Sequence, residues 1–185
     1  MRDEKLTEGS PYTLEGSFTK DLIFSKFWLC SMVSNYLDTM HMDIPLEVFV
    51  LGSWYGNIGL ILPLYPITIK KLILVDRDKD CIKTGRLMTK YLPFEVEARV
   101  QDVGTVSYGK PPQLVINTSC NDMQDQDWYS RIPTGTMVAL QSRDDHESLS
   151  QMDSRYPMER TLFLGSKYLK DPEMSYHRLM KIGVK

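Results

Sequence analysis

Glycines and an acidic residue follow two apolar runs of this sequence, at positions suited to a nucleotide-like ligand. Residues 47–59 read EVFVLGSWYGNIG, an apolar run that ends in a glycine turn and leads into a helix-like segment. The next apolar run, residues 71–75, ends at Asp76. Glycine lets the backbone approach a ligand closely, and a carboxylate at a strand end accepts two hydrogen bonds from a ribose diol. The pattern predicts a ligand at the carboxyl ends of parallel strands.

The elements that position these residues alternate between strand-like and helix-like patterns. From Ser17, the expected N-cap, to about His41, apolar residues recur at spacings of three and four, which predicts an amphipathic helix. Asp78 is expected to cap a helix that runs to about Tyr91, and short helices are expected over residues 57–65 and 125–132. The expected strands are residues 47–51, 71–75, 94–100, 114–119 and 136–141.

The last part of the chain has a different pattern. Residues 161–164 (TLFL) and 178–182 (RLMKI) are strand-like, and no strong helical pattern separates them, so an antiparallel pair is expected. The fold class is therefore α/β, a Rossmann-like doubly wound seven-stranded sheet with five parallel strands and an antiparallel C-terminal pair. Residues 1–16 are polar and are expected to form a flexible arm, and residues 17–185 a single domain.

Composition narrows the class of protein. The chain has 22 basic and 24 acidic residues, and this balance indicates no polyanionic partner. Its three cysteines form no CxxC or Cys/His cluster, so neither disulfides nor a metal site is expected. No apolar run has the length of a signal peptide core or a membrane span, which predicts a soluble cytoplasmic protein.

With these motifs the chain resembles the class I S-adenosylmethionine-dependent methyltransferase superfamily, and more loosely its small stand-alone members from phages and bacteria. VFVLGSWYG is similar to the family's first motif, LILVD to the second, VQDV with Asp102 to the third and LVINTS to the fourth. The first motif usually reads D/E-x-G-x-G-x-G. Gly52 and Gly56 hold its first and third glycine positions, whereas Val50 replaces the acid and Trp54 the middle glycine.

The resemblance implies a fold, a cofactor and site residues. The implied cofactor is S-adenosylmethionine, the implied activity is methyl transfer, and the expected partner is a small-molecule acceptor. The implied cofactor-binding residues are Gly52, Ser53, Trp54, Tyr55, Gly56, Asp76, Arg77, Asp102, Val103, Asn117 and Thr118. Asn117, Ser119 and Cys120 are the implied acceptor-pocket candidates, although a packed thiol is the favoured interpretation of Cys120.

Several interpretations stay open beside these. Asp102 is nearly as well explained as a solvated loop acid, and the rings of Trp54 and Tyr55 either face the sulfonium through a cation–π contact or simply pack. The D/N-P-P-Y/F sequence of amino-methylating DNA enzymes is matched only by Asn117. Lys20, Lys26 and Trp28 are lid candidates, with packing of the helix on the sheet edge favoured for Trp28.

Charge distribution bears on the acceptor. Residues 117–153 hold seven acids and two bases, a net charge of −5, and are expected to rim the acceptor pocket. A small or cationic acceptor is therefore favoured over a nucleic acid. Residues 155–185 hold seven bases and three acids, a net charge of +4, which is typical of a solvated face.

Three rival functions remain to be weighed. The first keeps the cofactor but transfers its aminocarboxypropyl group or performs a lyase step. The second, an NAD-dependent dehydrogenase, is disfavoured because G-x-G-x-x-G requires glycine where Trp54 stands. The third is a non-catalytic module with a degraded pocket, which the missing acid before Gly52 suggests.

Overall fold

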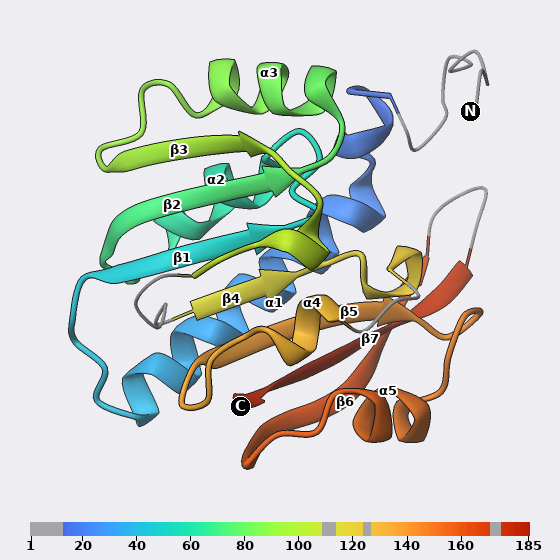
Figure 1. Cartoon of the computed structure of the whole chain (residues 1–185). Coiled ribbons are helices and arrows are strands. Elements are labelled where there is room, and N and C mark those ends of the chain that lie inside the picture. Colours follow the sequence, from blue (N-terminus) through green and yellow to red (C-terminus); the bar gives the residue numbers. More distant parts are fainter. Residues whose placement is uncertain (1–12, 109–113, 124–126, 171–174) are drawn as a thin grey trace.

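Seven strands form one sheet in the computed structural model of the chain, which describes residues 13–108, 114–123, 127–170 and 175–185. The strands are β1 (Leu46–Leu51), β2 (Ile69–Asp76), β3 (Glu95–Val100), β4 (Leu114–Asn117), β5 (Met137–Arg143), β6 (Arg160–Lys170) and β7 (Ser175–Val184). Their order across the sheet is β3-β2-β1-β4-β5-β7-β6 (Figure 1). Strands β1 to β5 pair in parallel, while β7 runs antiparallel to both β5 and β6. The predicted fold class is confirmed.

The register brings the predicted site residues to one edge of the sheet. Leu51, the last residue of β1, lies opposite Val75 of β2 and Asn117 of β4. The turns that follow these three parallel strands therefore leave the sheet side by side, at the edge toward which their arrowheads point in Figure 1. Ligands of open parallel sheets bind at this kind of edge.

Helices cover both faces of the sheet, because side chains alternate along each strand. One face packs against α1 (Lys20–Thr39), α2 (Asn57–Ile61) and α3 (Lys79–Met88). The other packs against α4 (Asp127–Ser130) and α5 (Leu149–Arg155). Strand β1 shows the alternation, since Val48 and Val50 lie in the first core and Phe49 and Leu51 in the second. Both faces are buried, as the continuous apolar runs predicted.

The C-terminal part was predicted least well. Strands β6 and β7 extend well beyond residues 161–164 and 178–182, because charged and polar residues also occupy strand positions near the exposed edge. Helix α5 was not predicted at all. Its capping box was a readable signal, since Ser148 Oγ accepts from the Gln151 amide and the Gln151 side chain accepts from the Ser148 amide.

Two element boundaries in the first half also differ from expectation. Ser17 is not the N-cap of α1, which begins at Lys20 after Thr19. Instead Ser17 lies in a 3-10 helix, Gly16–Phe18, where its hydroxyl donates to the Leu14 carbonyl (2.6 Å). Strand β4 ends at Asn117, so the last two residues of the predicted strand already belong to the loop after it.

The remaining expectations concern the chain ends and the membrane. Residues 1–12 of the expected arm lie outside the described residues, and the 3-10 helix starts at the arm's last position, Gly16. Within the described ranges, every helix is too short or too polar to cross a membrane.

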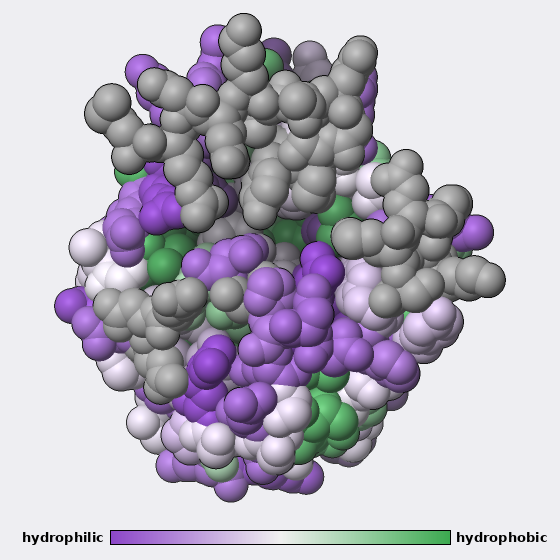
Figure 2. Space-filling view, turned by 90° about the vertical axis from the view of Figure 1, so that its right-hand side faces the viewer, coloured by the Kyte–Doolittle hydropathy of each residue, from purple (hydrophilic) through white to green (hydrophobic). Residues whose placement is uncertain are grey.

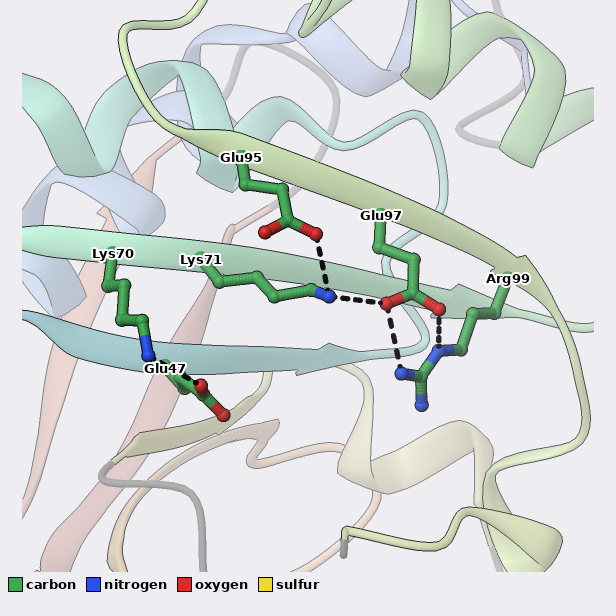
Figure 3. A network of polar contacts seen from close by, with 6 residues as sticks. All are labelled: Glu47, Lys70, Lys71, Glu95, Glu97 and Arg99. Carbon is green, nitrogen blue, oxygen red and sulfur yellow. Dashed lines mark hydrogen bonds and ion pairs between the residues drawn. The ribbon is translucent and has the colours of Figure 1, made fainter. Parts of the chain in front are cut away.

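An ion-pair network ties β3, the edge strand, to β2. Lys71 Nζ lies 2.7 Å from a Glu95 carboxylate oxygen and 2.9 Å from one of Glu97, and Arg99 Nε lies 2.7 Å from Glu97 (Figure 3). The pKa of Glu97 is lowered to about 2, first by hydrogen bonding to Arg99 and second by Lys71. The β2–β3 side of the sheet thus depends partly on the ionised state of Glu97.

Replacing Glu97 by glutamine should remove a contribution to the free energy of unfolding that is present at neutral pH and lost in acid. Because the folded-state pKa lies below the ordinary 4.5, this contribution is fully present above pH 4.5 and is lost as the pH falls toward 2. The side chain is 39% exposed, so we expect a loss of less than about 1 kcal/mol at pH 7.

Urea unfolding of E97Q and the unchanged chain between pH 2 and 7 measures this difference. The two curves should converge at low pH. Glu159, an exposed acid outside the network, provides the control variant E159Q. A difference between E97Q and the unchanged chain that stays constant down to pH 2 would contradict the assignment.

Candidate functional site

The turn between β1 and α2 adopts an unusual backbone conformation. Gly52, Trp54 and Gly56 all have positive φ, at 60°, 53° and 76°. The turn is closed by hydrogen bonds from the Ser53 amide to the Val75 carbonyl (3.0 Å) and from the Gly56 amide to the Ser53 carbonyl (2.8 Å). Trp54 occupies the middle glycine position of the motif in the left-handed conformation that glycine adopts without strain. The backbone path of a glycine turn is thus kept despite the substitution.

Asp76 holds this turn against the end of β2. One carboxylate oxygen accepts from the Trp54 amide (2.8 Å) and the other from the Asp78 amide (2.9 Å). Asp78 in turn caps α3, accepting from the amides of Asp80 and Cys81. A carboxylate has about four acceptor positions, so two bonds leave Asp76 able to accept two more. The half-buried Asp76 is therefore both a support of the turn and an available acceptor.

Two buried polar atoms near the turn lack partners among the described residues. They are Ser53 Oγ and Asn57 Oδ1. The Asn57 amide nitrogen donates to the carbonyl and hydroxyl oxygens of Ser17 (2.7 and 3.0 Å), which fixes the side chain. Buried polar groups normally have hydrogen-bond partners, so these two atoms are suited to a polar ligand at the turn.

The loop after β4 closes over the same turn. Asn117 is fully buried; its Oδ1 accepts from the Ser119 amide (2.9 Å) and its Nδ2 donates to Met123 Sδ (3.0 Å). A Cβ placed on Gly52 would overlap the Met123 methyl, so this methyl lies directly on the glycine. Ser119 is its other neighbour there. Asn117 therefore orients its own loop, and Met123, which no motif indicated, covers the glycine.

Cys120 lies inside the fold. It is fully buried, its thiol donates to the Asn117 carbonyl (3.5 Å), and burial raises the pKa of the thiol far above its ordinary value. A thiol is a nucleophile only as the thiolate. In this conformation Cys120 has the properties of a packing residue.

The remaining predicted residues flank the turn. Exposed Asp102 follows β3, where it caps the 3-10 helix Val103–Thr105 and accepts from the Gly104 amide (2.8 Å), and Arg77 is exposed after Asp76. The Trp54 ring stacks on Tyr55, with centroids 5.7 Å apart and an interplanar angle of 23°. The predicted residues lie at or just after the carboxyl ends of β1 to β4. This edge of the sheet faces the viewer in Figure 2, where hydrophilic side chains gather around the middle.

A second polar group lies under the first half of α1, next to β5 and β7. Its charged members are Lys26 and Asp21 of α1 and Arg178 of β7, all buried. Arg178 Nη2 donates to the Thr118 carbonyl, which joins this group to the loop after β4. Trp28 does not form a lid. Its ring packs edge-on against Phe163 of β6, with ring centroids 5.9 Å apart, as the packing interpretation predicted.

Burial of basic residues in β7 contradicts the solvated face expected for residues 155–185. Arg178 is 4% exposed and Lys181 1%. Lys181 Nζ contacts an Asp153 carboxylate oxygen (2.6 Å) and donates to the Tyr156 carbonyl (2.7 Å), so it ties α5 to the sheet. The expectation failed because net charge does not report which side of a strand a residue faces. Bases inside the apolar pattern of RLMKI were the available signal.

The chain was compared with known protein sequences and with solved structures. No known family's sequence profile matches the chain, and no curated protein sequence matches it. Its structure is similar to the N-methyltransferase NodS from Bradyrhizobium japonicum WM9, with a TM-score of 0.68, 11% identity and coverage of 91% of this chain and 99% of NodS. It is also similar to the magnesium protoporphyrin IX methyltransferase ChlM from Synechocystis PCC 6803, with a TM-score of 0.63 and 11% identity. This match covers 89% of this chain and 82% of ChlM.

A third similar structure is TehB from Haemophilus influenzae, with a TM-score of 0.59 and 12% identity. The match covers 80% of this chain but only 61% of TehB, so the chain spans less than two thirds of that protein. The chain therefore has the Rossmann-like fold of the class I methyltransferases.

The glycine turn makes a specific stability prediction. Gly52→Ala should destabilise the fold by about 1 kcal/mol, because alanine in the left-handed conformation carries that penalty. The Met123 methyl is the end of a flexible side chain and can rotate away from the new Cβ.

Gly135→Ala is the matched control. Gly135 also has positive φ (81°), but a Cβ there meets nothing within 4 Å. If urea unfolding gives equal losses of unfolding free energy for G52A and G135A, the Met123 side chain rotates away from the new Cβ. A loss for G52A larger by more than about 1 kcal/mol would show that Met123 is held rigidly on the glycine.

Proposed function

We propose that this protein binds S-adenosylmethionine at the β1–α2 turn and transfers its methyl group to a small-molecule acceptor. The observation that carries the proposal is the pairing of the left-handed glycine turn with Asp76, whose carboxylate fixes the turn and keeps acceptor positions for a ribose diol. The fold supports it, since structures similar to this one include NodS in complex with S-adenosylhomocysteine and ChlM with bound S-adenosylmethionine.

The residues present suit such a ligand. Asp76 would accept from the ribose hydroxyls, and Ser53 Oγ and Asn57 Oδ1 are buried polar atoms in need of partners. Gly52 and Gly56 would let the backbone approach the methionine moiety. The match of Asp102 to the family's third motif makes it the expected partner of the adenine amino group.

The chain's part in the reaction is positioning. S-adenosylmethionine supplies an activated methyl group on a sulfonium, so no covalent protein nucleophile is needed. The loop after β4, which Arg178 holds through the Thr118 carbonyl, would orient the acceptor atom toward that methyl. Alignment of reacting groups alone contributes strongly to rate, and this agrees with the buried, protonated state of Cys120.

The acceptor class is also part of the proposal. The similar structures include a 1,6-didemethyltoxoflavin-N1-methyltransferase from Burkholderia thailandensis, solved with that small molecule and S-adenosylhomocysteine (TM-score 0.60, 9% identity). The acidic loops between residues 117 and 153 also disfavour a nucleic acid. A small-molecule acceptor is therefore the conclusion we favour.

Asp76→Ala should weaken S-adenosylhomocysteine binding by about 1–3 kcal/mol, because the ribose would lose hydrogen bonds to a charged group. Isothermal titration calorimetry of the purified chain measures this. The unchanged chain should bind; absence of heat at millimolar ligand would refute the proposal.

The control for this variant is Asp80→Ala, which removes an exposed acid from the same stretch without touching the turn. Because Asp76→Ala also loses the bond to the Trp54 amide, its thermal unfolding must be checked first. If a folded D76A bound as tightly as D80A, the ribose would lie elsewhere.

One observation favours a second candidate, a binding module without activity. The Met123 methyl lies on Gly52, where the family's glycine faces the ligand, and Trp54 replaces the middle glycine. If Met123 is a permanent plug, the unchanged chain should not bind S-adenosylhomocysteine.

Met123→Ala separates the two candidates. Under the enzyme proposal Met123 is mobile, so the unchanged chain binds and M123A changes the affinity by less than about tenfold. If M123A gained binding that the unchanged chain lacks, the plugged module would be the correct description. Met152, a buried methionine of α5, provides the control variant M152L.

A further inference from the structure

Residues 13–18, which we call the N-terminal turn, form a compact segment at the edge of the sheet where the cofactor is proposed to bind. Within it, the Gly16 amide donates to Thr13 Oγ1 (2.9 Å) and the Ser17 amide donates to the Thr13 carbonyl (3.0 Å). In Figure 1 the turn is the dark blue segment on the side to which the arrowheads of β1 and β2 point. Ordering such a segment costs conformational entropy, so contacts with the rest of the fold must hold it.

Asn57, the first residue of α2, supplies such a contact. Its Nδ2 donates both to the Ser17 carbonyl (2.7 Å) and to Ser17 Oγ (3.0 Å), across 40 positions of the sequence. Asn57 is 3% exposed and Ser17 is 1% exposed, so these bonds are shielded from water. Asn57 also directly follows Gly56, the last residue of the glycine turn. One side chain therefore connects the N-terminal turn to the glycine turn.

Ser17 sets the orientation of the Asn57 amide. A backbone carbonyl only accepts hydrogen bonds, so the amide must present its nitrogen to Ser17 and its oxygen to the other side. That oxygen, Oδ1, is buried and has no hydrogen-bond partner among the described residues. Ser53 Oγ, in the same glycine turn, is also buried without one. An unsatisfied buried acceptor is costly, and this cost is removed by a ligand that supplies a hydrogen-bond donor.

We infer that Asn57 is a positioning residue that couples the binding of S-adenosylmethionine to the placement of the N-terminal turn. Asn57 Oδ1 accepts from a donor group of the cofactor, the methionine ammonium or a ribose hydroxyl, while Nδ2 holds Ser17. Both sets of bonds require the same rotamer and the same orientation of one amide, so each set favours the other. The inference deepens the proposed function and rests on it for the identity of the ligand.

The coupling acts in both directions. If the cofactor stabilises the N-terminal turn by some factor, the turn must raise the affinity for the cofactor by the same factor. Bonded groups also polarise one another, so a donor at Asn57 Oδ1 strengthens the bonds that Nδ2 makes to Ser17. The N-terminal turn is therefore held most firmly when the methyl donor is in place.

Hydrogen–deuterium exchange of the full chain measures this coupling. The amides of Ser17 and Phe18 donate to carbonyls within the N-terminal turn, so their exchange rates report its opening. Saturating S-adenosylhomocysteine should slow this exchange by about fivefold or more, the lower end of ordinary coupling factors. The amides of Met40 and His41, which form hydrogen bonds at the other end of α1, should exchange as before and are the internal control.

Asn57→Asp separates the coupling from direct protection of the turn by the ligand. Aspartate has nearly the same shape and keeps an accepting oxygen for the ligand, but it has no donor for Ser17. By calorimetry, N57D should still bind S-adenosylhomocysteine at millimolar concentration. The bound ligand should no longer slow exchange in the N-terminal turn. Asn35→Asp, which changes an exposed asparagine of α1, should leave the response as it is in the unchanged chain.

Three results would overturn the inference. The first is exchange in the N-terminal turn that stays the same when the unchanged chain is saturated with ligand, and the second is slowing that persists in N57D. The third is a folded N57D that no longer binds, because the accepting oxygen is retained there. If N57D does not fold, Ser17→Ala takes its place, since it removes one of the two acceptors of Asn57. The ligand should then slow exchange less than in the unchanged chain, and an equal effect would contradict the coupling.

Methylthioadenosine identifies the group of the cofactor that Asn57 binds, because it has the ribose but lacks the ammonium and carboxylate of the methionine part. If methylthioadenosine binds and slows exchange in the N-terminal turn, the partner is a ribose hydroxyl. If it binds without slowing exchange, the partner is the methionine ammonium.

Calorimetry with S-adenosylhomocysteine keeps the two proposals apart. If the unchanged chain gives no heat at millimolar ligand, the proposed function is refuted and the coupling with it. If the ligand binds but exchange in the N-terminal turn does not slow, only the coupling through Asn57 is refuted.

Discussion

The hydrogen bond from the Trp54 amide to the Asp76 carboxylate holds the site together. It joins the turn after β1 to the end of β2, and it helps to hold Trp54, a non-glycine residue, in a left-handed conformation that carries strain. Because Asp76 also accepts from the Asp78 amide, the start of α3 is held in the same place. One side chain thus holds together the ends of β1 and β2 and the helix that follows.

The loop after β4 connects the two halves of the site. The side-chain amide of Asn117 is buried, and both its oxygen and its nitrogen form hydrogen bonds within this loop. The carbonyl of the next residue, Thr118, accepts a hydrogen bond from Arg178 of β7. The antiparallel C-terminal pair therefore contributes to the site as well as to the sheet. This arrangement shows how a strand that is remote in sequence can fix a loop beside the glycine turn.

Most of the fold could be predicted from the chain because its elements follow simple periodicities. Continuous apolar runs such as VFVL and LILV predicted strands buried on both faces, and the register then brought Gly52, Asp76 and Asn117 together as expected. Helix α5 was missed although Ser148 and Gln151 form a capping box, because a seven-residue helix shows little periodicity. The extent of β6 and β7 was underestimated, since polar residues at a sheet edge break the apolar pattern.

The sequence by itself therefore determined the order of the strands along the chain, the glycine turn and the acidic residue that ends β2, because these depend on local periodicity and turn chemistry. Only the tertiary structure decided the burial and the contacts of Lys26, Arg178 and Met123. The charge of a lysine or arginine is visible in the sequence, but its burial and its partners depend on which elements pack over it. The same is true of Met123, whose contact with Gly52 joins residues 71 positions apart. Long-range packing, rather than any motif, decides which of these side chains are buried and what they contact.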